Sequence, residues 1–150
     1  MASRDYTTRR SGIVKALAEK LKIIDGTGAF HTNLYENVEP RLLFWDEVND
    51  FPTVHLNAGA ETREYQGGGY KDRFLSVTVR CYVQEENAPD ALSALMEDIE
   101  TVIEDNERLE YRDKLNVKHH THQISVMSIT TDEGVLEPLG VGEIELEVRY

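Results

Sequence analysis

The sequence has little of what secreted domains, cysteine-cluster metal sites and membrane proteins depend on. Its single cysteine, Cys81, rules out an intramolecular disulfide and a cysteine-cluster zinc site, and it agrees with a reducing cytoplasm. No apolar run approaches the ~20 residues that a membrane-spanning helix needs. The first residues, MASRDYTTRRSG, do not lead into the apolar core of a signal peptide. We therefore expect no membrane partner and a chain that stays in the compartment where it is made.

Catalytic signatures are also missing. The chain has no Gly-x-Ser-x-Gly, no Walker motif, no dinucleotide-binding fingerprint and no His-Glu-x-x-His. Carboxylates are frequent, but with 28 acidic residues in the chain, two that lie close together carry little weight as a general acid and base. We therefore expect a protein that is not an enzyme, has no cofactor and no catalytic residues, and acts through shape and assembly.

Basic residues are scarce as well. The 16 Lys and Arg residues stand against 28 Asp and Glu residues, which gives a formal net charge of −12. Such a surface repels phosphate groups, whereas sequence-specific DNA binding needs clustered Lys and Arg. An acidic surface nevertheless suits a channel through which DNA must slide without being held. The composition therefore argues against tight DNA binding but is compatible with a channel through which DNA passes.

The chain does contain two amphipathic helical patterns. In TTRRSGIVKALAEKLKIIDGTG, apolar residues recur at helical spacing, with Asp5 or Thr7 as candidate caps and Asp25 followed by Gly26 as the expected stop. In ENAPDALSALMEDIETVIEDNE, one stripe is apolar and the opposite face is acidic. The stripe consists of Leu92, Leu95, Met96, Ile99, Val102 and Ile103. The acidic residues, Asp98 among them, are expected in solvent.

Several other segments alternate with a period of two, which is typical of half-buried strands. An apolar run from Leu42 to Trp45 predicts a loop or short strand, and a true strand follows at 54–58. The clear alternation over 73–83 places Cys81 on the apolar face, where a free thiol is usually a core residue. Three consecutive glycines, Gly67 to Gly69, separate two strand-like runs and predict a hairpin with a mobile tip. Two more strands are expected in LNVKHHTHQISVMSITTDEG and GVGEIELEVRY.

These elements together predict an α+β fold. We expect a mostly antiparallel sheet with two helices packed on it and a long glycine-tipped β-hairpin. No repeat, linker or low-complexity segment divides the chain, so a single domain is expected over residues 1–150.

The segment KHHTHQ contains His119, His120 and His122 and raises the question of a metal site. On one continuous strand, His120 and His122 share a face with apolar residues while His119 points the other way. Two histidines fall short of a zinc or iron ligand set, and the spacing of His31 and His55 does not place either nearby. We interpret the cluster as strand-face or interface histidines. A pH-responsive contact and a small metal-dependent enzyme built on His120 and His122 are the alternatives.

The order of elements resembles that of a known family of viral proteins. With VEPRLLFWDEVNDFPTVHLNAGAETREYQ leading into the hairpin and TTDEGVLEPLGVGEIELEVRY closing the chain, it resembles tail terminator (tail completion) proteins of long-tailed bacteriophages over nearly its whole length. The resemblance implies a structural virion protein that caps the growing tail tube as a homohexameric ring, stops tube polymerisation and forms the head-docking surface. Its implied partners are further copies of itself, the tail tube protein and a head-completion or neck protein. DNA would pass through the lumen without specific binding. The implied location is the virion tail at the head–tail junction, after assembly in the host cytoplasm.

Two sets of residues are candidate contact sites under this resemblance. The hairpin EYQGGGYKDRF could reach a neighbouring subunit or the tube, since exposed aromatic residues often anchor interfaces. Its candidate contact residues are Tyr65, Gly67, Gly68, Gly69 and Tyr70. The outward row of the last strand is a candidate for the lumen or a charged subunit interface, with a solvated strand face as the alternative. This row consists of Glu143, Glu145 and Glu147. Another neck or tail component, such as a head-closure or tube-like protein, is the second interpretation.

Overall fold

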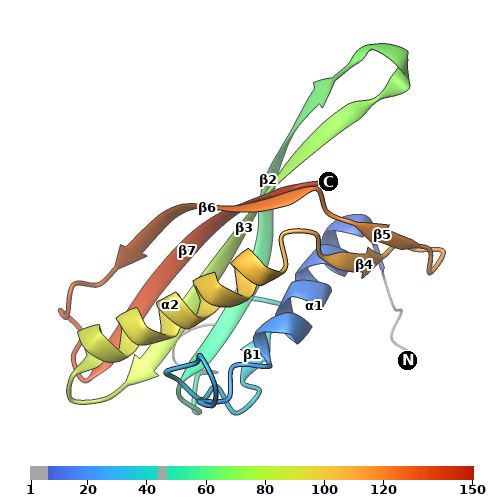
Figure 1. Ribbon diagram of the computed structural model, residues 1–150. Coiled ribbons are helices and arrows are strands. Elements are labelled where there is room, and N and C mark those ends of the chain that lie inside the picture. Colours follow the sequence, from blue (N-terminus) through green and yellow to red (C-terminus); the bar gives the residue numbers. More distant parts are fainter. Residues whose placement is uncertain (1–6, 44–46) are drawn as a thin grey trace, which may run out of the picture.

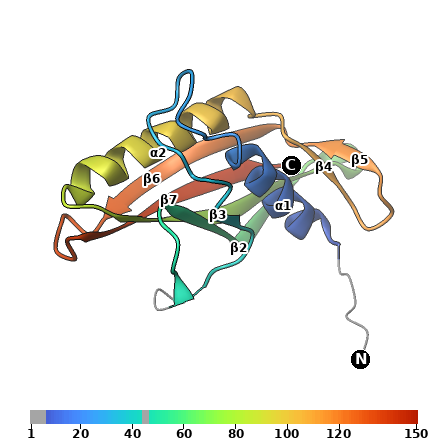
Figure 2. The same cartoon turned by 90° about the horizontal axis from the view of Figure 1, so that it is seen from below.

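The computed structural model describes residues 7–43 and 47–150, in which two helices cover one face of a sheet (Figures 1 and 2). The candidate cap Asp5 and the end of the predicted apolar run, Phe44 and Trp45, lie outside the described residues. The larger sheet has the strand order β1-β2-β3-β7-β6. Its strands are β1 (Val38–Glu39), β2 (Thr53–Tyr65), β3 (Lys71–Gln84), β6 (Gln123–Thr131) and β7 (Leu139–Arg149). All neighbours pair antiparallel except β1, which is parallel to β2. The predicted α+β fold, with its mostly antiparallel sheet and two helices, is confirmed.

Helix α1 (Arg9–Leu21) begins at a capping box. The Ser11 N–H donates to the Thr8 hydroxyl at 3.1 Å, and the Thr8 N–H donates to the Ser11 hydroxyl at 2.8 Å. The cap is therefore Thr8, one residue beyond the expected Thr7. The helix ends at Leu21 and not at the expected stop, while Gly26 lies in the following turn with a φ of 78° that favours glycine.

Helix α2 (Ala88–Asp105) buries every apolar residue expected on its stripe. The helix packs closely on β7 because Gly142 has no side chain, and a Cβ there would lie 2.6 Å from Cε of Met96. The prediction for Asp98 was wrong, since this residue is only 1% exposed. Its carboxylate accepts the backbone N–H groups of His31 at 3.0 Å and Thr32 at 2.8 Å. The Asp98 carboxylate thereby fastens the segment after α1 to α2.

Neither helix of the described residues is long and apolar enough to span a membrane.

Strands β3 and β7 form the centre of the sheet, and their alternate residues supply its core face. The buried residues are Leu75, Val77, Val79, Cys81 and Val83 of β3, with Ile144, Leu146 and Val148 of β7. Burial of one such aliphatic side chain stabilises the fold by about 1.5–3 kcal/mol relative to exposure. Cys81 is fully buried, and burial raises the pKa of its thiol to about 12. Its predicted place in the core is confirmed, and its chemistry is that of an inert thiol.

The histidine-containing segment is not one strand. It forms β5 (Lys118–His120), which pairs with β4 (Glu110–Arg112) in a small separate sheet, and the chain then turns into β6. Thr121 causes the break, because its side chain is buried. Its hydroxyl donates to the carbonyl of Glu107 and accepts the N–H of Leu109, both at 2.8 Å. The predicted continuous strand, and the shared histidine face derived from it, were therefore wrong.

Candidate assembly surfaces

The outer part of the β2–β3 ribbon projects from the rest of the molecule (Figure 1). Every side chain from Thr62 to Lys71 is exposed, so this part of the ribbon has no core of its own. Gly67–Gly69 form a short 3₁₀ turn between the strands, and the φ angles of Gly68 and Gly69 are 76° and 85°. Tyr65 and Tyr70 flank the turn and are 74% and 76% exposed. The structure thus brings all five predicted contact residues together at one exposed tip.

The base of this ribbon is fixed to the body by the last residue of the chain. The Tyr150 hydroxyl donates a hydrogen bond to the Glu61 carboxylate. The guanidinium groups of Arg9 and Arg73 lie 5.2 Å and 5.4 Å from the centre of the Tyr150 ring. Burial, and then the Glu61 hydrogen bond, raise the pKa of Tyr150 to about 12. The ribbon therefore combines an anchored base with an uncovered tip.

The glutamate row lies on the sheet face opposite the helices, because the residues that alternate with it in β7 face the core. Since β7 lies between β3 and the edge strand β6, the row is one strand away from the β6 edge of this face. Glu143 accepts two hydrogen bonds from Arg80, at 2.6 Å and 2.9 Å. Glu145 accepts one from the hydroxyl of Thr78 at 2.8 Å. Glu143, Glu145 and Glu147 are all half-buried, so the row belongs to a partly neutralised polar face.

The sheet has two edges that the described residues leave open. Strand β6 pairs with β7 alone and contains no charged residue. Its residues Val126, Met127 and Ile129 are 37%, 60% and 44% exposed. At the other edge, β1 covers only Val54 and His55 of β2. Open edges are sites of pairing between chains, and charged residues usually protect them, so the uncharged β6 edge favours a partner.

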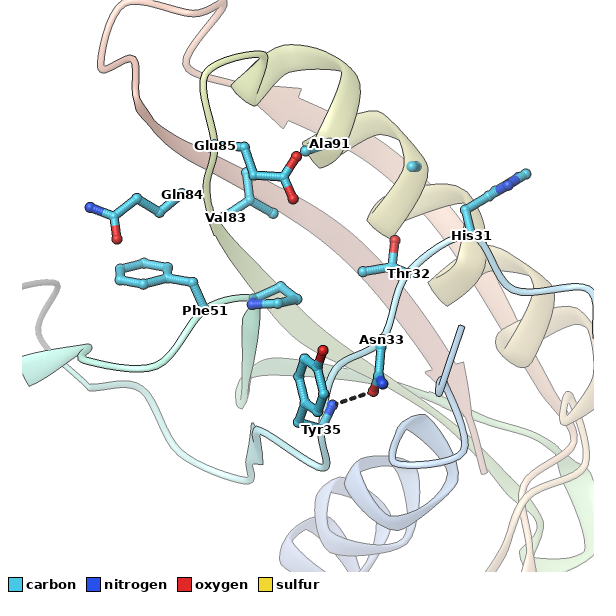
Figure 3. A pocket seen from close by; sticks show the side chains of 11 residues that line it. His31, Thr32, Asn33, Tyr35, Phe51, Val83, Gln84, Glu85 and Ala91 are labelled. Carbon is cyan, nitrogen blue, oxygen red and sulfur yellow. Dashed lines mark hydrogen bonds between the residues drawn. The ribbon is translucent and has the colours of Figure 1, made fainter. Parts of the chain in front are cut away.

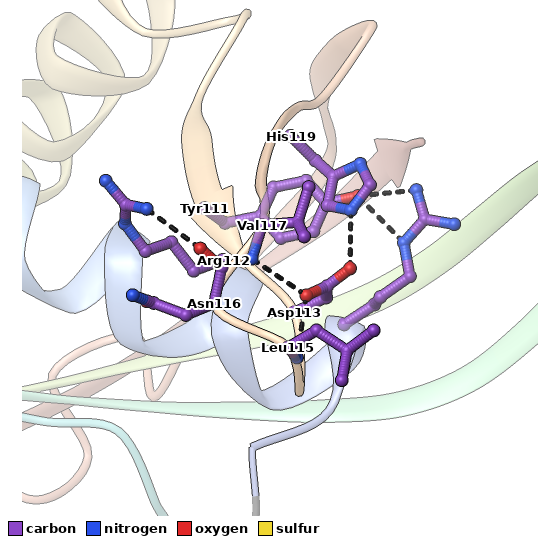
Figure 4. Close-up of polar contacts among 8 residues, drawn as sticks. Tyr111, Arg112, Asp113, Leu115, Asn116, Val117 and His119 are labelled. Carbon is purple, nitrogen blue, oxygen red and sulfur yellow. Dashed lines mark hydrogen bonds and ion pairs between the residues drawn. The ribbon is translucent and has the colours of Figure 1, made fainter.

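The turn between β4 and β5 is held by a network around Asp113 (Figure 4). The Asp113 carboxylate accepts the N–H groups of Leu115 at 2.9 Å and Val117 at 3.0 Å, and its Oδ2 lies 2.8 Å from Nε2 of His119. The His119 contact and then the backbone bonds lower the pKa of Asp113 to about 2. The His119 ring is stacked on Tyr111 with 5.6 Å between the ring centres. His119 is thus a structural residue of this turn.

The remaining four histidines differ in their surroundings. His120 and His122 are exposed. His31 lies 3.5 Å from the carboxylate of Glu97, whereas His55 is buried, which lowers its pKa. Within residues 7–43 and 47–150, no three or more His, Cys, Asp or Glu side chains are grouped so that they could hold a metal. The alternative of a metal-dependent enzyme therefore finds no ligand set in that part of the chain.

A cavity of about 430 Å³ lies between the segment after α1 and the start of α2 (Figure 3). Turn residues and aromatic and aliphatic side chains line it, and the Tyr35 N–H donates to Oδ1 of Asn33 at 2.8 Å. Among the lining residues, no hydroxyl or thiol is hydrogen-bonded to a histidine or a carboxylate. The cavity thus lacks the activated nucleophile of a covalent catalyst.

An exposed ribbon with two tyrosines and an uncharged open strand edge are features typical of proteins that contact other chains. Comparison with known proteins identifies the family. The family model described as bacteriophage tail tube terminator protein matches residues 7–150. The tail tube terminator protein p142 of Escherichia phage T5 is 34% identical over 149 residues, which cover 94% of this chain and 92% of that protein. The chain belongs to the bacteriophage tail tube terminator family and is a structural protein of the phage tail, not an enzyme. The resemblance stated from the sequence is confirmed.

Two features of the structure escaped the sequence analysis. The buried role of Asp98 gave no local signal, because the residue sits in an otherwise acidic helix. The open β6 edge did leave a signal, since QISVMSITT has no charge in a chain of which 29% is charged. That contrast marks an unprotected strand once the strand is known to lie at an edge.

Proposed function

We propose that this protein caps the tail tube as a homohexameric ring, stops tube polymerisation and forms the surface to which the head docks. The site of action is the head–tail junction of the virion, after assembly in the host cytoplasm. The tail tube protein and a head-completion or neck protein are its partners on the two sides of the ring. Membership of the tail tube terminator family supports this assignment.

The projecting ribbon is the observation that carries the proposal. An isolated two-stranded ribbon is marginally stable in water, because it cannot bury a hydrophobic face. Here the tip extends beyond the body and presents Tyr65 and Tyr70 to solvent. Tyrosine gives large contact area with little loss of side-chain entropy, and it is enriched where interfaces concentrate their binding energy. In the proposed assembly, the tip packs against a neighbouring subunit or the tube.

The charge of the chain supports passage of DNA through the ring. A net charge of −12 disfavours binding to phosphate groups, so DNA can move past such a protein without being retained. The sheet face that bears Glu143, Glu145 and Glu147 is the proposed lining of the lumen. Because Arg80 already neutralises Glu143, the repulsion in this arrangement comes mainly from Glu145 and Glu147.

The test is complementation of a phage whose own copy of this gene is disrupted. A Tyr65→Ala, Tyr70→Ala double variant should fold normally, because both side chains are exposed and outside the core. It should leave tails of abnormal length and few infectious particles. The matched control is Tyr35→Ala, which removes a tyrosine that is 70% exposed but lies far from the ribbon in sequence.

Tail length is measured by electron microscopy and folding by circular dichroism. Tails of normal length with the double variant would contradict the role of the ribbon. The mass of the purified protein, measured by light scattering, distinguishes the terminator ring from the second interpretation, another neck or tail component. Continuous tubes formed by the protein alone would favour a tube-like component, whereas a closed hexamer favours the terminator ring.

A further inference from the structure

The two helices carry opposite charge. Helix α1 contains four basic residues and one acidic residue, Glu19. Helix α2 contains six acidic residues and no lysine or arginine. The acidic residues of α2 are Asp90, Glu97, Asp98, Glu100, Glu104 and Asp105. From Cys81 to Glu107 the chain has no basic residue at all, so this asymmetry is a property of a whole region.

The two helices lie next to each other on one face of the sheet, with α1 towards β2 and α2 towards β6 (Figure 2). Helix α1 contacts β1, β2 and β4, whereas α2 contacts β3, β7 and β6. The basic helix therefore lies over the β2 side of the sheet, and the acidic helix lies over β3 and β7 and reaches the edge strand β6. Each side of the molecule thus combines one open strand edge with one helix of defined charge.

The α2 side presents apolar and acidic groups together. The exposed apolar residues of β6 are Val126, Met127 and Ile129. Helical geometry places Glu100 and Glu104 on neighbouring positions of the same helix face, one turn apart. Neither glutamate has an ion-pair partner in the described part of the chain.

The α1 side presents a groove with basic residues. A groove of about 280 Å³ lies between α1 and β2. Its lining includes Arg10, Val14 and Lys15 of α1 and Asn57 and Ala58 of β2. Helical spacing places Lys22, the residue after α1, on the same side as Lys15 and two turns further along. The Lys22 ammonium lies 2.8 Å from the Glu19 carboxylate, so it adds less positive charge to this side than an unpaired lysine would. This side therefore offers a small cavity next to positive charge.

We propose that the α2 and β6 side of one subunit packs against the α1 and β2 side of the next copy of the same chain. The inference rests on the proposed ring and names the contact that closes it. Acidic α2 then faces basic α1, and the apolar residues of β6 meet the groove beside β2. Pairing of like sides would place α2 against α2 and is opposed by repulsion.

The strand directions agree with this contact. Successive antiparallel pairs from β2 through β3 and β7 to β6 make β2 and β6 run in opposite directions. Two subunits in the same orientation can therefore bring these edges together as antiparallel neighbours. A head-to-tail contact of this kind is heterologous and generates a ring when the rotation between subunits closes.

Two charge-reversal variants test the contact. The first carries Lys15→Glu and Lys22→Glu on α1, and the second carries Glu100→Lys and Glu104→Lys on α2. Each alone places like charges across every contact, so each should lose the ability to produce tails of normal length in the complementation assay. Expressed together they should restore it, because in a ring of alternating variants the native α2 of one meets the native α1 of the other, and the two reversed helices meet each other with opposite charges. An even-membered ring can close by alternation of the two.

Matched controls reverse the same number of charges outside α1, β2, α2 and β6. They are Arg108→Glu with Lys114→Glu, and Glu133→Lys with Glu137→Lys, all at exposed positions. Both controls should support normal tails, and circular dichroism with thermal melting establishes that every variant is folded. Normal tails from either single helix variant, or no restoration by the folded pair, would overturn the contact while leaving the ring itself intact. A wild-type protein that fails to set tail length would instead overturn the proposed function.

Discussion

Replacement of Asp98 by alanine should destabilise the protein strongly, although this residue lies in a helix that is acidic along its exposed face. The carboxylate accepts backbone N–H groups of His31 and Thr32 at 3.0 Å and 2.8 Å, and it is 1% exposed. Alanine would remove both acceptors at once. The segment after α1 would then lose its direct hydrogen-bonded attachment to α2.

The magnitude follows from the two hydrogen bonds. A hydrogen bond to a charged group contributes about 1.5–3 kcal/mol, and a buried donor left without a partner costs a similar amount. Because His31 is exposed, water can replace its lost bond in part, which puts the total near the lower end. We expect a loss of about 2–4 kcal/mol, out of the roughly 8–20 kcal/mol typical of a chain of this size. Asp98→Asn keeps one acceptor oxygen and should lose about half as much.

The assay is urea unfolding followed by circular dichroism. With a slope of about 2 kcal/mol per molar urea, the Asp98→Ala midpoint should fall by roughly 1–2 M. Glu104→Ala is the control on the same helix, since Glu104 is exposed and its loss should change stability by less than about 0.5 kcal/mol. Equal midpoints for Asp98→Ala and Glu104→Ala would refute the reasoning.

Two further changes test the packing of α1 and the β4–β5 turn. Gly12→Ala should destabilise by about 1–3 kcal/mol despite the higher helix propensity of alanine, because its Cβ would lie 2.4 Å from the carbonyl oxygen of Arg112. Gly59→Ala is the matched control, with its nearest atom, the Ser76 oxygen, at 3.8 Å, and equal urea midpoints for the two variants would contradict the close approach. The pKa of Asp113 is lowered from 3.8 to about 2, so its contribution to stability is complete above about pH 4 and is lost as the pH falls through about 2. The wild type should therefore lose more stability between pH 4 and pH 2 than Asp113→Asn, and parallel curves in acid unfolding would count against the network.

Much of the fold could be predicted because helices and strands leave local periodic patterns. The stripe of α2 from Leu92 to Ile103 is buried as expected, and so is the alternation of β3 around Cys81. The row of Glu143, Glu145 and Glu147 also lies on one face, because alternation in a strand needs no knowledge of its neighbours. The break at Thr121 could not be predicted, since it depends on hydrogen bonds to residues that lie more than ten positions away.

By itself, the sequence determined the elements, the acidic character, the inert cysteine and the resemblance to tail terminators, all of which are encoded in local pattern or composition. The tertiary structure decided the strand order, and with it which edges stay open and which helix lies beside each edge. It also showed that Asp98, expected in solvent, is buried and binds the segment after α1. His119, one of the histidines considered for a metal site, instead contacts Asp113 and stabilises the β4–β5 turn. The physical reason is that strand pairing and side-chain burial depend on which distant segments come into contact. The free energy of those contacts cannot be derived from any one segment of the sequence.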